Sequence, residues 1–147
     1  MITIPQANKE NDHVRGITAY TPSQTTYIGI STADVFSNDG NVPANSEPEF
    51  TGYARIAVPN NGNTWNTSSQ GKVTNKVELS FNEFSSESTT GIAKWIFESE
   101  TANGTNDVMY YAKLEPEIPL TQYLTIRFSA GDIEFTRTNP PTQQSQQ

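Results

Sequence analysis

The stretch Gly71-Lys-Val-Thr-Asn-Lys-Val-Glu-Leu-Ser-Phe81 alternates between two kinds of side chain along its length. One face carries Asn75 with the apolar Val73, Val77, Leu79 and Phe81. The other face carries only charged and hydroxyl groups. Successive side chains of a strand point to opposite sides of a sheet, so a period of two is typical of a strand with one buried face. These residues therefore predict a half-buried β-strand.

Similar runs of strand-forming residues, separated by turn signals, lie on both sides of this stretch. They are residues 26–31, 52–58, 91–97, 107–114, 123–128 and 131–136. Pro116 and Pro119 bound a further short edge piece, and residues 82–90 are expected to form a loop. Short strands with turn signals about every 8–12 residues are typical of an all-β sandwich or barrel. We expect an all-β fold, a single antiparallel β-sandwich of about seven strands.

The 147 residues predict one folded domain, over residues 25–138, flanked by two segments of different character. Residues 1–24 show no hydrophobic period and are expected to form an extended N-terminal arm. Residues 139–147 contain two adjacent prolines and then polar residues of low complexity. Such a segment cannot bury enough surface to offset the entropy lost on ordering, so we expect a disordered C-terminal tail.

Charge and composition exclude several classes of protein. Asp plus Glu number 16 against 9 Lys plus Arg, which gives a net charge of -7 and argues against nucleic acid as a partner. The chain has no cysteine, which excludes disulfides and thiolate zinc sites. No apolar run approaches the roughly 20 residues that a membrane helix needs, so no membrane partner is expected.

The sequence offers little for catalysis. The only histidine, His13, lies in the predicted arm, and its spacing indicates no catalytic triad. Three carboxylate pairs two residues apart each point to one face of a strand, as in a glycosidase site or on a solvated surface. They are Glu98 with Glu100, Glu115 with Glu117, and Asp132 with Glu134. We favour the solvated surface and expect no enzyme, no cofactor and no metal site. Residues 37–41 resemble only the start of a calcium loop, so calcium binding by residues 32–51 stays open.

Aromatic residues supply candidate contacts with a partner or ligand. Trp95 lies inside a strong strand and is expected in the core, whereas Trp65 lies in a polar loop, where an indole suits an interface or a sugar. Tyr110 and Tyr111 point to opposite faces of their strand, so at most one of them turns inward.

Tyr53 and Arg55 lie in an otherwise apolar strand. Arg55 is either an outward side chain paired with a neighbouring carboxylate or an anchor at an interface. The candidate interface or ligand contacts are Trp65, Arg55, Tyr53 and Tyr111.

The order of these motifs resembles a family of small bacteriophage virion proteins and tail-fibre domains. Residues 26–34 are followed by an acidic loop and by Gly52-Tyr-Ala-Arg-Ile-Ala-Val58, as the family's "YLGLFT-x-D" and "GYAR" strands are. Four later stretches continue the order, so that the resemblance covers residues 25–138. They are residues 75–81, 91–98, 108–114 and 124–132.

This resemblance implies a non-enzymatic virion structural protein that assembles with other phage structural proteins as a homo-oligomer or in several symmetric copies. A tail component is favoured: a tail fibre, a fibre adaptor or the baseplate periphery. The alternatives are a capsid decoration or head-fibre protein, or a carbohydrate-binding module that binds a host glycan during host attachment. The protein is expected in the virion, after synthesis in the host cytoplasm.

Overall fold

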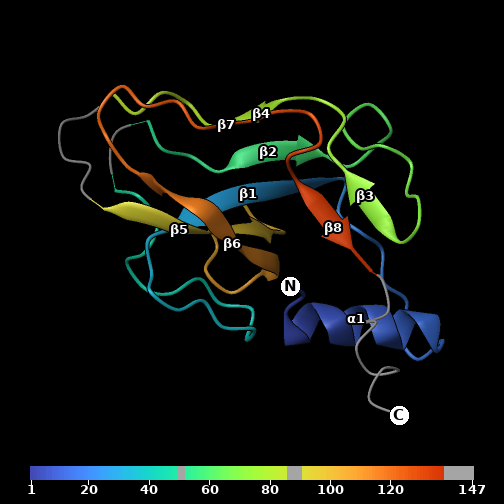
Figure 1. The fold of residues 1–147 in the computed structure, drawn as a ribbon. Helices are drawn as coiled ribbons and strands as arrows, with labels where there is room; N and C mark the ends of the chain where they lie inside the picture. Colours follow the sequence, from blue (N-terminus) through green and yellow to red (C-terminus); the bar gives the residue numbers. More distant parts are fainter. Residues whose placement is uncertain (50–51, 86–90, 138–147) are drawn as a thin grey trace, which may run out of the picture.

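The computed structural model describes residues 1–49, 52–85 and 91–137. This part of the chain is mostly β, with one short helix near the N-terminus (Figure 1). In chain order the elements are α1 (Ile4–Val14), β1 (Thr25–Ser31), β2 (Ile56–Pro59), β3 (Lys72–Thr74), β4 (Leu79–Ser80), β5 (Ile92–Ser99), β6 (Val108–Pro119), β7 (Arg127–Phe128) and β8 (Glu134–Thr136).

The largest element is a four-stranded antiparallel sheet with the strand order β2-β1-β5-β6. Its two central strands carry apolar residues on both faces, which is expected for strands covered from both sides. β6 is an edge strand, and a bulge interrupts its pairing with β5 between Ala93 and Trp95.

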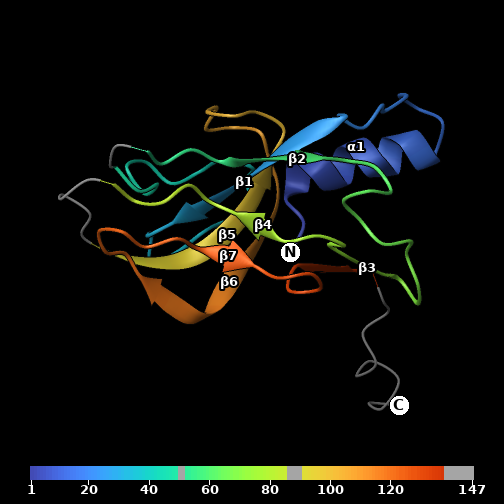
Figure 2. The same cartoon turned by 90° about the horizontal axis from the view of Figure 1, so that it is seen from above.

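The two faces of this sheet are covered differently (Figures 1 and 2). One face packs against the short ladders β4–β7 and β3–β8 around a core that includes Ile28, Ile30, Val58, Phe81 and Ile133. On the other face, Phe36 and Val42 from the loop after β1 pack on Phe97, Val108 and Tyr111. The sheet is therefore the middle layer of the fold.

The prediction of an all-β antiparallel sandwich is confirmed only in part: the described chain is mostly β but contains one short helix, and the second layer consists of two small two-stranded sheets. Residues 71–81 form two short strands instead of one, because Asn75 turns fully inward between them. Its Nδ2 donates to the carbonyls of Val77 and Ser129, and its Oδ1 accepts from the amides of Gly131 and Ile133. These four hydrogen bonds replace ladder pairing, and Val77, predicted inward, is 43% exposed.

Four other predicted strands have clearly different bounds in the structure. Of residues 131–136, only Glu134–Thr136 are in a strand, β8. Of residues 52–58, only those from Ile56 onward are in a strand, β2. Of residues 123–128, only Arg127 and Phe128 are in a strand, β7. Tyr123 has a φ of 65°, which a strand does not accommodate. The predicted edge piece at 116–119 is instead the end of β6.

The prediction of an extended N-terminal arm is wrong for residues 4–14, which form α1. Pro5 lies in its first turn, where proline favours a helix. The hydrophobic period that would have shown this helix is missing because its inward face is polar: Gln6 is buried, and Glu10 is partly buried. The tail predicted at 139–147 lies outside the described residues, as does most of the 82–90 loop.

Candidate functional site

Arg55 connects the loop after β1 to the loop after β5 through hydrogen bonds of its guanidinium. Its side chain is 1% exposed, and its Nε and Nη2 donate to the two oxygens of Glu47 at 2.9 and 2.8 Å. Nη1 and Nη2 also donate to the carbonyls of Thr101 and Gly104 at 2.9 and 2.8 Å. The guanidinium lies 5.0 Å from the centroid of the Phe97 ring. Pairing with a neighbouring carboxylate is confirmed, but the outward orientation is wrong.

Tyr53 belongs to the same network. Its hydroxyl donates to Glu47 Oε1 at 2.9 Å and accepts from the amide of Ile30, while its ring stacks on Phe81. Burial raises the pKa of Tyr53 far above its ordinary value, and the charge of Glu47 raises it further. Tyr53 and Arg55 therefore hold the loop after β1 in place from within the chain.

Trp65 is half-buried at the wall of a small cavity of about 230 Å³. Its Nε1 donates to Asn60 Oδ1 at 3.0 Å, and its ring lies 5.6 Å from that of Phe135. Thr26 and Glu98 also line this cavity. The indole thus joins the turn after β2 to β8.

Tyr110 and Tyr111 do point to opposite faces, as predicted. Tyr111 is buried against Phe36 on the loop-covered face, with ring centroids 5.2 Å apart. Tyr110 is half-buried on the other face, 5.1 Å from Phe135. Trp95 is half-buried beside the Phe36 cluster.

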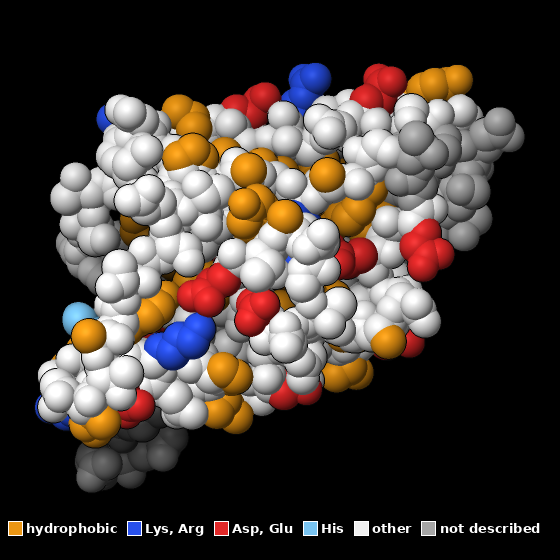
Figure 3. Space-filling model, turned by 180° about the vertical axis from the view of Figure 1, so that it is seen from behind, with side chains coloured by type: hydrophobic (Ala, Val, Ile, Leu, Met, Phe, Trp, Pro, Cys, Tyr) orange, Lys and Arg blue, Asp and Glu red, His pale blue; other side chains and the backbone are white. Residues whose placement is uncertain are grey.

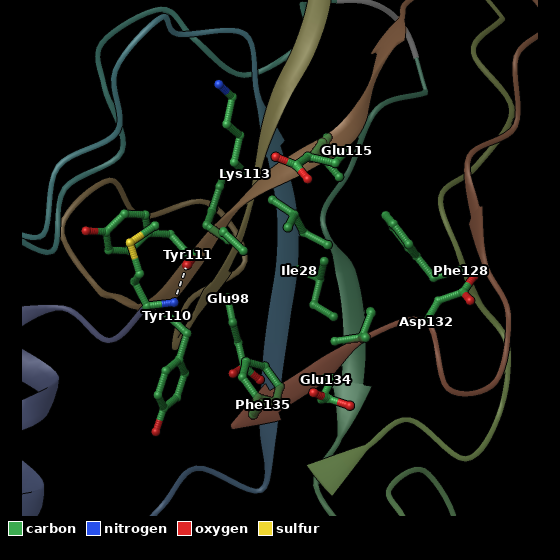
Figure 4. Close-up of a pocket in the computed structure, with 16 residues that line it drawn as sticks. Ile28, Glu98, Tyr110, Tyr111, Lys113, Glu115, Phe128, Asp132, Glu134 and Phe135 are labelled. Carbon is green, nitrogen blue, oxygen red and sulfur yellow. Dashed lines mark hydrogen bonds between the residues drawn. The ribbon is translucent and has the colours of Figure 1, made fainter. Parts of the chain in front are cut away.

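A groove of about 570 Å³ lies between β5 and β6 on one side and the β7–β8 segment on the other (Figure 4). We call it the β6–β8 groove. Its apolar lining includes Ile28, Ile96, Phe128, Ile133 and Phe135. Carboxylates from all three of the acidic pairs noted in the sequence also line it, namely Glu98, Glu115, Asp132 and Glu134. Lys113 and Glu115 lie at the end of the groove opposite Glu98 and Glu134 (Figure 4).

Glu98 is the buried carboxylate of this groove. It is 7% exposed and accepts a hydrogen bond of 2.6 Å from Thr26 Oγ1. Burial raises the pKa of the Glu98 carboxyl, and the Thr26 hydrogen bond offsets part of that rise. Since both cavities include Glu98, it lies on the wall between them. The expectation that the acidic pairs lie on a solvated surface is therefore wrong for Glu98, which is buried.

The N-terminal segment lies along β6, and Met1 lines the groove. The Met1 ammonium donates to the Tyr111 carbonyl at 2.6 Å, and the Thr3 amide donates to the Met109 carbonyl at 2.9 Å, which extends the sheet beyond β6. Burial lowers the pKa of this ammonium. No pattern in the sequence predicted this pairing.

A second contact holds α1 against β6. The Tyr110 hydroxyl donates to Glu10 at 2.7 Å, and Arg137 donates both to Glu10 and to the Tyr110 hydroxyl. Burial raises the pKa of Tyr110, and its hydrogen bond to Glu10 raises it further. Helix, edge strand and the end of β8 therefore meet in one charged cluster, which sequence reasoning also missed.

The remaining sequence candidates occupy structural positions. His13 Nδ1 accepts from the amide of Tyr20 at 3.0 Å, and the Asp39 carboxylate accepts from the amide of Asn41 at 2.9 Å. Within residues 1–49, 52–85 and 91–137, no three His, Asp or Glu residues gather closely enough to hold a metal ion. The described helix is too short to cross a membrane. On the face in Figure 3, acidic side chains are spread among hydrophobic ones.

Comparison with protein families decides the class of the protein. The family model described as "Podophage GP4 fiber I protein gp80" matches residues 2–136. The chain belongs to this family of phage fibre proteins. No curated protein matches the sequence. The protein is a virion fibre component and, as a member of a structural family, not an enzyme. This confirms the resemblance to phage virion proteins, and a fibre protein implies assembly with other phage proteins.

Proposed function

We propose that this fibre protein is a component of the phage tail, present in several copies, and that it acts through contacts with other phage proteins. The Arg55 network carries the proposal together with the family. Its buried guanidinium joins the loop after β1 to the loop after β5 through hydrogen bonds to Glu47, Thr101 and Gly104. Removing one partner of a buried pair of this kind is strongly destabilising, so the network keeps the two loops in one arrangement for such contacts.

Labelling of intact particles tests this proposal. Gold-labelled antibody raised against the purified chain should decorate the tail in negatively stained virions. Label on the head would instead support a capsid decoration or head-fibre protein. Particles without label would refute a virion location for this fibre protein.

Host-glycan binding is a second candidate, favoured by the half-buried Trp65 beside a cavity that also contains Asn60 and Thr26. Aromatic faces and polar side chains together suit sugar rings. A glycan array with the purified chain should give hits that Trp65→Ala removes. Tyr123→Ala, at a 68% exposed aromatic elsewhere, is the matched control and should keep them. An array without hits would remove this candidate.

A further inference from the structure

Residues 14–17, Val-Arg-Gly-Ile, form a projecting segment at the end of α1. Val14 and Ile17 are each 71% exposed, and Arg15 lies between them in the sequence. Five other cations of the chain are in ion pairs, namely Lys9, Arg55, Lys72, Lys94 and Arg137. The Arg15 side chain has no hydrogen bond or ion pair with any residue that the structure describes.

The backbone of this segment is already fixed. The amides of Arg15, Gly16 and Ile17 donate to the carbonyls of Asn11, His13 and Asp12, respectively. Gly16 has a φ of 73°, which turns the chain sharply after the helix. A preformed segment loses little conformational entropy when it binds, so it is suited to a contact.

The β6–β8 groove is complementary to this segment in chemistry. Its walls are largely apolar. They also carry four carboxylates, which outnumber the two positive groups, one lysine and the Met1 ammonium. Of those carboxylates, Glu115 has no ion pair with the described residues, and Glu134 has only an exposed pair with Lys72 at 3.6 Å. One aliphatic–arginine–aliphatic segment therefore matches the groove both in charge and in hydrophobicity.

We infer that residues 14–17 of one copy of the protein bind in the β6–β8 groove of a second copy, with Arg15 facing the carboxylates of the groove. This inference rests on the proposal that the protein works in several copies. Because α1 of the same chain is held against β6 by Glu10 and Tyr110, the projecting segment is left for a neighbour. The contact joins two different surfaces, so it builds either a ring or a chain of copies.

The test uses the purified full chain, with its mass measured by size-exclusion chromatography and light scattering over a range of concentrations. The natural chain should associate, and Arg15→Glu should weaken the association about tenfold or more, because it places a like charge against the groove. The double variant Glu115→Gln/Glu134→Gln removes two of the groove carboxylates without adding positive charge, and it should weaken the association from the other side. Arg127→Glu, the same charge change at an exposed site on β7, is the control and should associate as the natural chain does.

A mixture of the two defective variants makes the test decisive. Arg15→Glu retains an intact groove, and the groove variant retains an intact Arg15, so a 1:1 mixture should form a dimer and nothing larger. Formation of that dimer also shows that both variants are folded. A natural chain that stays monomeric, an Arg15→Glu chain that associates normally, or a mixture that does not pair would each overturn the inference. The association test uses purified protein and does not depend on where antibody labels the virion. Its failure would therefore overturn this inference without overturning the proposed tail location.

Discussion

The Phe97 ring occupies the space that a side chain on Gly29, its partner across β1 and β5, would need. A Cβ on Gly29 would lie 2.4 Å from Cζ of Phe97, closer than packing allows. The phenyl ring in turn contacts Phe36 from the loop after β1 and the Arg55 guanidinium. Gly29 therefore permits the packing of the loop-covered face.

Gly29→Ala should accordingly destabilise the protein, by about 1–3 kcal/mol, because the ring must move within a packed core. The loss of unfolding free energy can be measured by urea unfolding, with tryptophan fluorescence as the signal. Gly62→Ala is the matched control, since a Cβ there meets nothing within 4 Å, and it should stay within about 0.5 kcal/mol of the natural chain. Equal effects of the two changes would contradict the packing described.

Removal of the Arg55 side chain should lower the free energy of unfolding by more than Gly29→Ala does. Arg55→Ala leaves Glu47 without its ion-pair partner and the carbonyls of Thr101 and Gly104 without these donors, and we expect a loss of about 3–5 kcal/mol in unfolding free energy. Arg55→Lys should recover only part of this, because an ammonium cannot form the two-bond contact. Arg127→Ala, at an exposed arginine, should change stability by about 0.5 kcal/mol or less. A near-neutral Arg55→Ala would show that the network is dispensable.

Asn75→Asp tests the inward turn between β3 and β4. The carboxylate cannot donate to the carbonyls of Val77 and Ser129, so two buried acceptors lose their partner. At about 1–3 kcal/mol for each such group, the unfolding midpoint in urea should fall markedly. Asn82→Asp, at an exposed asparagine, should leave the midpoint nearly unchanged.

Glu98 gives the protein a predictable pH dependence. Its pKa is raised in the folded state, so the folded chain holds this proton to higher pH than the unfolded chain does. The contribution of Glu98 to stability therefore falls as pH rises from the ordinary glutamate pKa through the raised value, and stays low above it. Glu98→Gln should be more stable than the natural chain near pH 8, and the difference should shrink on acidification. Thermal unfolding across that pH range checks this, and parallel curves would contradict it.

The sequence predicted best the strands that are runs of strand-forming residues. β1, β5 and β6 lie close to their predicted positions, and each of them contains buried apolar residues of the main sheet. The predictions were wrong where buried polar side chains determine the local structure. Residues 71–81 show an apolar period of two, but the Asn75 side-chain amide replaces the ladder bonds of a single strand there. The helix α1 buries Gln6, so it lacks the apolar period that predicts a helix.

The candidate site shows the same division. Alternation placed Tyr110 and Tyr111 on opposite faces and grouped the acidic residues by face, which the structure confirms for the two tyrosines. It did not predict that Arg55 would be enclosed, because Glu47 and the carbonyl of Thr101 reach it from distant loops. Long-range partners of this kind leave no local signal in a single sequence.

Trypsin cleavage after Arg15 tests most directly that this protein works through contacts between assembled chains. The bond lies in an exposed segment, so it should be cut readily in the free protein at dilutions where the chain is a monomer. In intact particles, a neighbouring copy should cover the same bond, and cleavage should be slowed strongly. Equal cleavage rates in the monomer and in the particle would contradict the account.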